Sequence, residues 1–197
     1  GDGMYKTLDG GRTWKHIGLV NTEHFSRVVV NPENPDIVFA AAMGHEWAPN
    51  SERGLYRSTD GGATWKQILF VNDTTGGGDV TLDPTNPNVV YAGMYDYLRK
   101  PWYFRSGGPG SGLYRSTDGG DTWVKLTDPA IQNGLPSSTP LGRIDVRVSR
   151  SNPSVVYAMI ESREGLLWRS DDRGDHWRMV NKENRINNRP FYFSNIR

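Results

Sequence analysis

Short apolar runs alternate with polar turns along the whole chain, and one such pattern occurs four times. Each copy contains a strand-like run, a tight polar turn and a tryptophan that opens the next apolar run. The shared core is Ser/Thr-x-Asp-x-Gly with a tryptophan three residues after the glycine, and the copies begin at Thr7, Ser58, Ser116 and Ser170. A near-fixed period of about 50 to 60 residues predicts a repeat protein.

The polar turn has the composition of a tight hairpin. Its aspartate accepts hydrogen bonds from backbone N–H groups two residues on, and its glycine supplies a positive φ. The tryptophan is expected to be buried between neighbouring sheets. We interpret the aspartates as structural, because a catalytic acid is not needed four times at regular spacing. The four sets are Asp9, Gly11 and Trp14; Asp60, Gly62 and Trp65; Asp118, Gly120 and Trp123; and Asp172, Gly174 and Trp177.

Each full repeat contains four strand signals with no helical pattern between them. This arrangement predicts an all-β fold, a β-propeller built of four-stranded antiparallel blades. Residues 1–197 are expected to form a single partial propeller, an arc of three full blades with partial blades at both ends. The expected boundaries are a half-blade at 1–17, blades at about 24–70, 78–126 and 142–180, and the start of a next blade at 189–197.

The composition excludes several classes of function. Lys and Arg number 23 against 22 Asp and Glu, so the net charge of +1 leaves no large basic face for nucleic acid. The absence of cysteine excludes disulfides, thiol catalysis and cysteine-based zinc sites. The histidines have no partners at metal-ligand spacing, so we expect no metal and no cofactor. No apolar run approaches the length of about 18 residues that a membrane span needs. The chain begins within a repeat and without Met, which indicates a piece of a longer protein.

The repeats resemble a known family. Ser58–Trp65 and Ser116–Trp123 are similar to the Asp-box of bacterial-neuraminidase-type repeats. The chain also resembles large secreted bacterial proteins of the sortilin-like, glycosyl-hydrolase-like propeller group, through its Gly-Leu-Tyr-Arg-Ser-Thr-Asp-Gly-Gly repeats and the Gly-rich insertion at Pro101–Gly112. The resemblance implies a propeller fold and a secreted or periplasmic setting. Arg173 and His176 depart from the repeat, which predicts a looser fourth turn.

One position is polar at the start of each innermost strand. Alignment on the following turns places Arg27, Asp79 and Asp145 at equivalent positions, with Asn195 as a fourth member. On the loop-bearing rim these residues would form a polar ligand site near the central channel. The alternative is structural, namely a salt bridge between Arg27 and Asp79 on adjacent blades.

Two loops carry aromatic and charged residues that suit a ligand on the same rim. The longest insertion, Tyr95–Ser111, holds Trp102, Tyr103 and Arg105, and the loop Met43–Arg53 holds a second group, His45, Glu46 and Trp47. Aromatic faces beside hydrogen-bonding groups suit sugars and peptide side chains. The alternatives are a loop that packs on itself and a solvated His–Glu pair.

Three functional interpretations follow. The first is a binding module that holds a glycan or peptide on its loop-bearing rim. The second, implied by the resemblance to xyloglucanases and sialidases, is part of a glycoside hydrolase, with Asp79 and Asp145 as the carboxylate pair to test; no sialidase arginine motif is present. The third is a scaffold fragment. The expected partners are a glycan or peptide and further blades, from a parent chain or a second copy.

Overall fold

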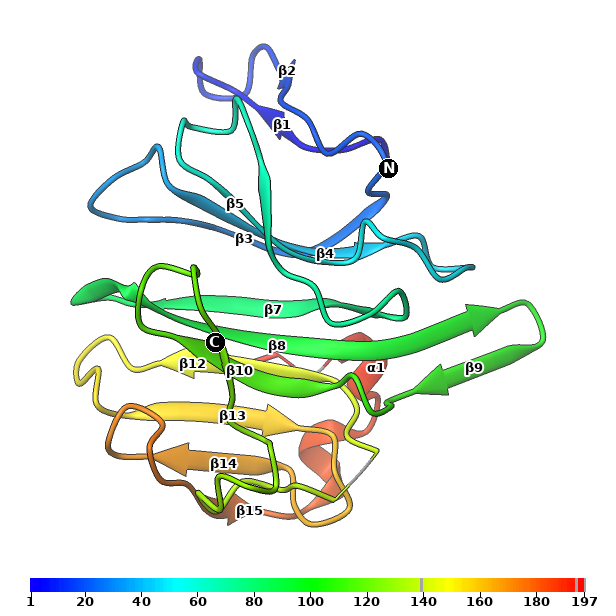
Figure 1. Ribbon diagram of the computed structural model, residues 1–197, viewed down its shortest axis with the longest axis vertical. Coiled ribbons are helices and arrows are strands. Elements are labelled where there is room, and N and C mark those ends of the chain that lie inside the picture. The colour runs from blue at the N-terminus through cyan, green and yellow to red at the C-terminus, as the bar shows by residue number, and fades with distance from the viewer. Residues whose placement is uncertain (139, 194, 197) are drawn as a thin grey trace.

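The computed structural model describes residues 1–138, 140–193 and 195–196, which form four antiparallel sheets stacked in chain order (Figure 1). The first sheet has two strands, β1 (Tyr5–Lys6) and β2 (Lys15–His16). The second has β3 (His24–Val30), β4 (Val38–Gly44), β5 (Gly54–Ser58) and β6 (Lys66–Leu69). The third has β7 (Thr75–Asp83), β8 (Asn86–Lys100), β10 (Gly112–Ser116) and β11 (Val124–Lys125), with β9 (Tyr103–Ser106) paired to the far part of β8. The fourth has β12 (Ile144–Val148), β13 (Val156–Ile160), β14 (Leu167–Ser170) and β15 (Arg178–Asn181).

The sheets are the blades of a β-propeller. Within each sheet, strands that follow one another in the repeat are hydrogen-bonded neighbours, and all of them are antiparallel. The predicted fold class is therefore confirmed, with an arc of three four-stranded blades after a two-stranded one. We call the four sheets blades 1 to 4 in chain order.

Apolar side chains from neighbouring blades form the core. One cluster joins Phe39 and Leu55 of blade 2 to Val80 and Met94 of blade 3. A second cluster joins blades 3 and 4. The backbones approach closely at Gly93, where an added Cβ would lie 2.3 Å from the carbonyl oxygen of Ile144. The facing sides of blades 2 and 3, and those of blades 3 and 4, therefore cover each other.

The repeated turn, here called the aspartate turn, joins the third and fourth strands of each blade through the same hydrogen bonds. In blade 2 the Gly62 N–H donates to Ser58 Oγ at 2.8 Å, and the Thr64 N–H donates to Asp60 Oδ1 at 2.8 Å. The Thr64 hydroxyl donates to Asp60 Oδ2 at 2.6 Å. These bonds, led by that of the Thr64 hydroxyl, lower the pKa of Asp60 to about 2. The aspartate is thus held in the turn as an ionised hydrogen-bond acceptor.

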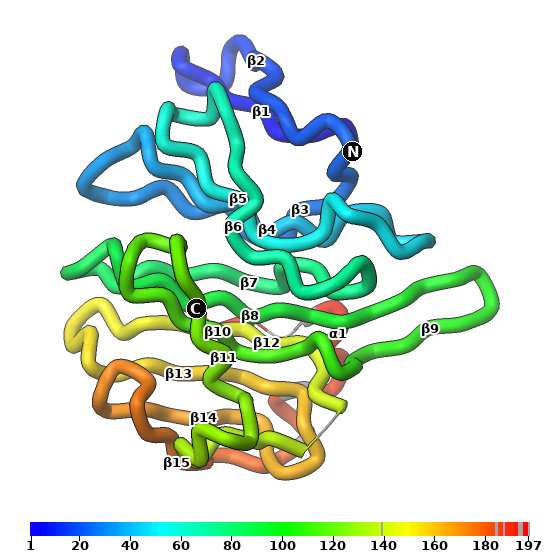
Figure 2. Tube along the Cα trace, viewed as in Figure 1, coloured from blue at the N-terminus to red at the C-terminus, as the bar shows by residue number. Residues whose placement is uncertain are grey.

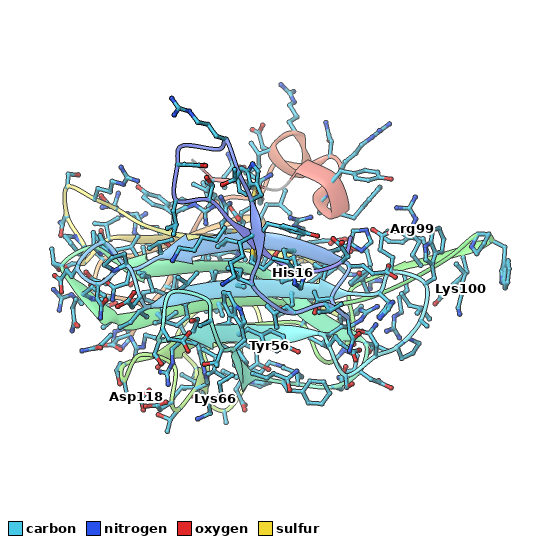
Figure 3. All side chains as sticks on the ribbon, turned by 90° about the horizontal axis from the view of Figure 1, so that it is seen from above. His16, Tyr56, Lys66, Arg99, Lys100 and Asp118 are labelled. Atoms are coloured by element: carbon cyan, nitrogen blue, oxygen red, sulfur yellow. The ribbon has the colours of Figure 1, made fainter. Side chains whose placement is uncertain are left out.

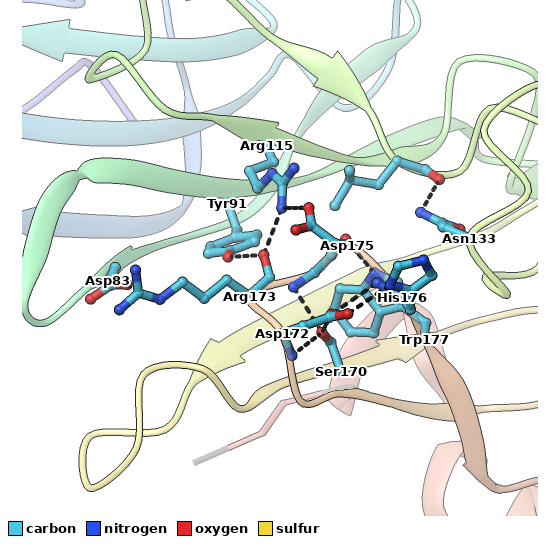
Figure 4. A network of polar contacts seen from close by, with 12 residues as sticks. Asp83, Tyr91, Arg115, Asn133, Ser170, Asp172, Arg173, Asp175, His176 and Trp177 are labelled. Atoms are coloured by element: carbon cyan, nitrogen blue, oxygen red, sulfur yellow. Dashed lines mark hydrogen bonds and ion pairs between the residues drawn. The ribbon is translucent and has the colours of Figure 1, made fainter.

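The fourth aspartate turn is not looser than the others, contrary to the expectation (Figure 4). Arg173 adopts a φ of +59°, close to the +68° of Gly61 at the equivalent position. His176 replaces the usual threonine, and its Nδ1 lies 2.7 Å from Asp172 Oδ2. The Gly174 N–H donates to Ser170 Oγ at 2.8 Å, as in blade 2. The arginine accepts the left-handed conformation, and the imidazole supplies the hydrogen bond of the missing hydroxyl.

The four repeat tryptophans differ in burial. Trp177 is 6% exposed, and Trp123 packs against the core between blades 2 and 3. Trp65 is half-buried and donates from Nε1 to the carbonyl oxygen of Ile17 at 2.8 Å. Trp14 is 60% exposed, so the expectation of burial is wrong at this position. The reason is that none of the sheets formed by the described residues covers the outer side of blade 1.

Two segments differ from the elements expected from the sequence. The insertion Tyr95–Ser111 is mainly a β-hairpin extension in which β8 continues to Lys100 and returns as β9. This hairpin projects from the edge of the stack, as the trace in Figure 2 shows. Residues 189–197 were expected to begin a strand, but Pro190–Phe193 form the one-turn helix α1, which follows the 3-10 turn η1 (Asn184–Asn187). Ser194 and Arg197 lie outside the described residues.

Candidate functional site

The first polar group lies on the innermost strands of blades 2 to 4. Arg27 on β3 contacts Asp79 on β7, with 3.0 Å between Nε and Oδ1. Arg147 on β12 contacts the other oxygen of Asp79 at 2.5 Å, and its Nη2 lies 3.5 Å from Asp145 Oδ1. Asp79 is 1% and Asp145 is 2% exposed. The two arginines, at 35% and 21% side-chain exposure, stand between these carboxylates and solvent.

Both carboxylates also join one blade to the next. Asp79 Oδ2 accepts a hydrogen bond from the Val146 N–H at 2.9 Å, and Asp145 Oδ2 accepts one from the Ile196 N–H. Val146 and Ile196 are the residues that follow the aligned polar position. The inter-blade salt bridge considered from the sequence is therefore present between Arg27 and Asp79, and a ligand role for these residues stays a prediction.

Asp145 has an unusual acidity. Burial raises its pKa to about 7, and the neighbouring Asp79 adds to the shift by hydrogen bonding and charge repulsion. Arg147 and the Ile196 N–H act in the opposite direction. A carboxyl group with such a pKa still carries a proton near neutral pH, as a general acid requires.

The second candidate site is a pocket on the loop side of blades 2 and 3. Its volume is about 320 Å³. It is bounded by β3, β4, the β8–β9 hairpin and α1, and its lining residues are His24, Phe25, Ser26, Met43, Glu46, Tyr95, Tyr97, Arg99, Phe104, Arg143, Phe191 and Tyr192. We call it the aromatic pocket. It combines aromatic rings with arginines, and Glu46 is the one carboxylate among these lining residues.

The aromatic rings are held in place from behind. Tyr95 and Tyr97 are two residues apart and lie on the same face of β8, and their rings stack with 5.1 Å between centroids. The Arg53 guanidinium lies 4.3 Å from the centre of the Tyr97 ring. Phe104 on β9 packs against Phe191 of α1 at 4.9 Å. The pocket floor is thus preorganised by the strand alternation and by contacts that do not involve a ligand.

Arg53 is a buried residue beside the aromatic pocket that the sequence interpretation missed. It is fully buried and donates to the carbonyl oxygens of Thr74 at 2.7 Å, His45 at 2.8 Å and Tyr97 at 3.0 Å. It therefore ties together the two loops and the strand that surround the pocket. Its place immediately before the Gly-Leu-Tyr-Arg-Ser repeat was the available signal, because an arginine directly before a buried strand needs acceptors.

Charged residues border the pocket on the side of the hairpin. Glu46 Oε2 lies 4.0 Å from Arg99 Nη1, and Arg99 lies over the Trp47 ring at 5.6 Å. His45 Nδ1 contacts Glu23 Oε1 at 3.0 Å, so its partner is not the adjacent Glu46. Figure 3 shows Arg99 and Lys100 on the projecting hairpin.

The remaining residues proposed from the sequence do not gather in one place. Trp102 at the hairpin tip is 84% exposed, and Tyr103 is 49% exposed. Arg105 contacts the buried Asp96 at 2.6 Å. Of the proposed ligand residues, Glu46 lines the aromatic pocket, and Arg27 lines a separate open groove of about 640 Å³ along the innermost strands.

The stacked four-stranded blades define the chain as part of a β-propeller. The Sortilin-Vps10 family model, described as "Sortilin, neurotensin receptor 3", matches residues 2–130, and the chain belongs to this family. The glycosyl-hydrolase-like character expected from the resemblance is also found among its relatives.

The chain is similar to Xyloglucanase Xgh74A of Acetivibrio thermocellus, with 43% identity over 163 residues, which cover 78% of this chain and 17% of that protein. Among solved structures, an ancestral GH74 enzyme superposes with a TM-score of 0.68 at 21% identity, over 94% of this chain and 22% of that one. The GH74 xyloglucanase from Xanthomonas campestris gives a TM-score of 0.58 at 17% identity, over 92% and 27%. These structures support the fold, and the chain spans about a sixth of the length of the xyloglucanase relative.

Residues 1–138, 140–193 and 195–196 contain neither a membrane-spanning helix nor a cluster of metal ligands. No helix there has the length and apolar character needed to cross a membrane. No group of three or more His, Asp or Glu side chains is placed to hold a metal ion within the same residues.

Proposed function

We propose that this chain is a section of a glycoside-hydrolase-like propeller and that its aromatic pocket binds a glycan. The observation that carries the proposal is the pocket itself, which places the rings of Tyr95, Tyr97 and Phe104 beside the Arg99–Glu46 pair. Sugar rings have apolar faces and hydroxyl edges, and the pocket offers a partner for each. The similarity to a xyloglucanase makes xyloglucan the first ligand to test.

Binding to xyloglucan oligosaccharides, measured by isothermal titration calorimetry, tests the proposal. Phe104 is 42% exposed, so Phe104→Ala removes a ring from the pocket without opening the core. We expect this variant to bind about fivefold more weakly, since stacking on one aromatic ring contributes roughly 1 kcal/mol. Trp14→Ala is the matched control, because Trp14 is an exposed aromatic residue on blade 1.

Equal loss of binding in Trp14→Ala and Phe104→Ala would contradict the location of the site. Binding of peptides without any binding of glycans would contradict the ligand class. Trp102→Ala and Trp47→Ala then define how far the site extends along the hairpin and the neighbouring loop. We expect Trp47→Ala to weaken binding less than Phe104→Ala does, because Trp47 supports Arg99 and does not itself line the pocket.

Hydrolysis of the glycan is the second candidate function, favoured by the xyloglucanase relatives and by the raised pKa of Asp145. In this interpretation Asp145 is the proton donor and Asp79 the second carboxylate. Both are buried behind Arg27 and Arg147, so substrate access requires these arginines to move. Release of reducing ends from xyloglucan should fall at least about 100-fold in Asp145→Asn. Unchanged release would exclude Asp145 as the acid.

We further propose that residues 1–197 form one partial propeller domain of a secreted or periplasmic protein, completed by further blades. The support is the family relationship and the small share of the xyloglucanase relative that the chain spans. Proteolysis of the folded chain tests the domain proposal, which predicts that no cut between blades releases a stable fragment.

A further inference from the structure

Each aspartate turn in blades 2 to 4 docks on the preceding blade through one repeated set of contacts. A basic residue directly before the Ser or Thr that opens a turn donates to a carbonyl oxygen in the next blade's turn. Lys6 Nζ donates to the Gly61 oxygen at 2.9 Å, and Arg57 Nη1 donates to the Gly119 oxygen at 2.6 Å. Arg115 Nη1 donates to the Arg173 oxygen at 2.7 Å. The acceptor is in each case the residue after the turn aspartate.

The arginines among these residues also contact the side chain at the fourth position of the turn, counted from its aspartate. Arg57 Nη2 contacts Asp121 at 2.8 Å, and Arg115 Nη1 contacts Asp175 at 2.7 Å. Lys6 faces a turn with Ala63 at the equivalent position, and it contacts the carbonyl oxygen alone. An arginine is thus matched with an acidic turn.

Apolar side chains complete each docking surface beneath the glycine of the turn. A Cβ added to Gly62 would lie 2.5 Å from Ile17, and one added to Gly120 would lie 2.7 Å from Ile68. At Gly174 the neighbours are Tyr91 and Leu126. Tyr91 also donates from its hydroxyl to the Arg173 oxygen at 2.6 Å, beside the bond from Arg115 (Figure 4). A glycine is required because the turn lies directly on these side chains.

Blade 4 carries the same set of residues, and no further blade lies on it within the part of the chain that the structure describes. Arg169 corresponds to Arg115, Tyr157 to Tyr91 and Val180 to Leu126. Tyr91 is fully buried, whereas Tyr157 is half-exposed and Val180 is 39% exposed. Arg169 Nη1 lies 3.0 Å from the Tyr157 hydroxyl, so the two donors that converge on Arg173 in the previous blade are also together here. A hollow of about 250 Å³ lies beside Arg169.

We infer that Tyr157, Arg169 and Val180 form a docking surface for the aspartate turn of another blade, and that this turn has a glycine at its third position and an acidic residue at its fourth. The carbonyl oxygen of the second turn residue accepts hydrogen bonds from Arg169 and Tyr157. The acidic residue pairs with Arg169, whose present carboxylate partner is Asp171 in its own turn. Arg178 adds a second positive charge at 3.7 Å from Asp171.

The first turn of a second copy does not have this chemistry. Its third residue is Gly11, but its fourth is Arg12, which would face Arg169 with the same charge. This turn is nevertheless exposed, from the turn glycines to Trp14. A single substitution therefore converts a second copy into a probe of the docking surface.

The test is the concentration dependence of the weight-average mass of Arg12→Asp, measured by light scattering and sedimentation equilibrium. The substitution gives the first turn the acidic residue found at Asp121 and Asp175. We expect Arg12→Asp to associate with a dissociation constant at least about tenfold lower than that of the unchanged chain. Adding Arg169→Met should abolish the gain.

Arg163→Asp is the matched control, because it makes the same change in net charge at an exposed residue between β13 and β14. Thermal unfolding of each variant verifies that the fold is retained. The inference is overturned if Arg12→Asp has the same mass as the unchanged chain at all concentrations. It is also overturned if the association of Arg12→Asp persists with Arg169→Met or is matched by Arg163→Asp.

Discussion

Arg53 shows how one buried residue can organise the loops around a pocket. Its two terminal nitrogens donate to backbone carbonyl oxygens, with no carboxylate among its hydrogen-bond partners, whereas its buried Nε has no hydrogen-bond partner among the described residues. Burial lowers its pKa, but an arginine side chain stays protonated in proteins. The positive charge therefore fixes the two loops beside the aromatic pocket.

Replacement of Arg53 should consequently be costly. Arg53→Met leaves the carbonyl oxygens of Thr74, His45 and Tyr97 without their donor, and we expect the free energy of unfolding to fall by about 3 kcal/mol. Urea denaturation measures this change. The control is Arg99→Met, which should change stability by less than about 1 kcal/mol, because the Arg99–Glu46 pair is partly exposed and 4.0 Å long. Similar losses for both variants would argue against a special role for Arg53.

Asp145 predicts a pH dependence of stability. Its pKa rises from the ordinary 3.8 to about 7 on folding, so the folded state binds the additional proton between these values. Stability contributed by the protonated group is fully present below pH 3.8 and is lost as the pH rises toward 7. The pH dependence should therefore be weaker in Asp145→Asn across this interval, as measured by thermal unfolding from pH 4 to pH 8. An identical pH dependence in both proteins would contradict the raised pKa.

For single residues, the sequence predicted which of them occupy equivalent positions in the blades better than it predicted their burial and contacts. The alignment of Arg27, Asp79 and Asp145 from turn spacing was sound, since the hydrogen bonds to Val146 and Ile196 repeat from blade to blade. Burial was not predictable, because it depends on Arg147, which belongs to a different aligned position. Arg53 was missed for the same reason, as its acceptors come from loops distant in sequence.

Among the elements, the fourth aspartate turn shows that a repeat can tolerate substitution without losing its geometry. Arg173 pays a conformational cost that glycine does not, because its φ of +59° is left-handed. We expect Arg173→Gly to stabilise the protein by about 1 kcal/mol. Gly174→Ala is the contrasting variant and should destabilise, since its φ is +89° and an added Cβ would lie 3.3 Å from Tyr91. Denaturation of both variants tests the pair of predictions, and a destabilised Arg173→Gly would show that the Arg173 side chain contributes more than its strain costs.

The aspartate turns also predict sensitivity to acid. The Thr13 and Thr64 hydroxyls and N–H groups lower the pKa values of Asp9 and Asp60 to about 2. The turns therefore contribute stability above pH 3.8 that is lost as the pH falls toward 2. Asp60→Asn should show a smaller change in melting temperature between pH 5 and pH 2 than the unchanged chain. A steeper change in the variant would exclude this origin of acid unfolding.

The turn and strand pattern was largely predictable because it is local. Aspartate, glycine and tryptophan at fixed spacing define a hairpin regardless of its neighbours. The β8–β9 hairpin was instead interpreted as a loop, since Pro101 and the glycines after Ser106 obscured the strand signals of Tyr95–Lys100 and Tyr103–Ser106. The helix α1 was also missed, because Phe191 has its packing partner Phe104 on that hairpin.

At the scale of the whole molecule, contacts between neighbouring blades make the stability of one blade depend on the next. Arg115 joins blade 3 to blade 4 through Arg173 and Asp175. Arg115→Ala should increase amide hydrogen exchange in β12–β15 more than in β3–β6, with a cost of about 1.5 kcal/mol at the interface. Arg163→Ala serves as the control and should leave exchange unchanged. Equal increases in blades 2 and 4 would indicate that the arc unfolds as one unit.

The propeller arc itself was predictable from the repeat, whereas the aromatic pocket was not. The repeat defines what every blade shares, and the pocket is built from what differs between them, namely the long hairpin of blade 3, the Glu46 loop of blade 2 and α1. Such differences meet only in three dimensions. This explains why Glu46 was found from the sequence while Arg143, which lines the same pocket, was not.

The direction of the docking contacts has a consequence for biosynthesis. In every pair of blades described, the basic and apolar docking residues precede in the chain the turn that lies on them. A ribosome therefore releases each receiving surface before the segment that covers it. Folding during translation can proceed blade by blade from the N-terminus, with each new hairpin added to a template that already exists.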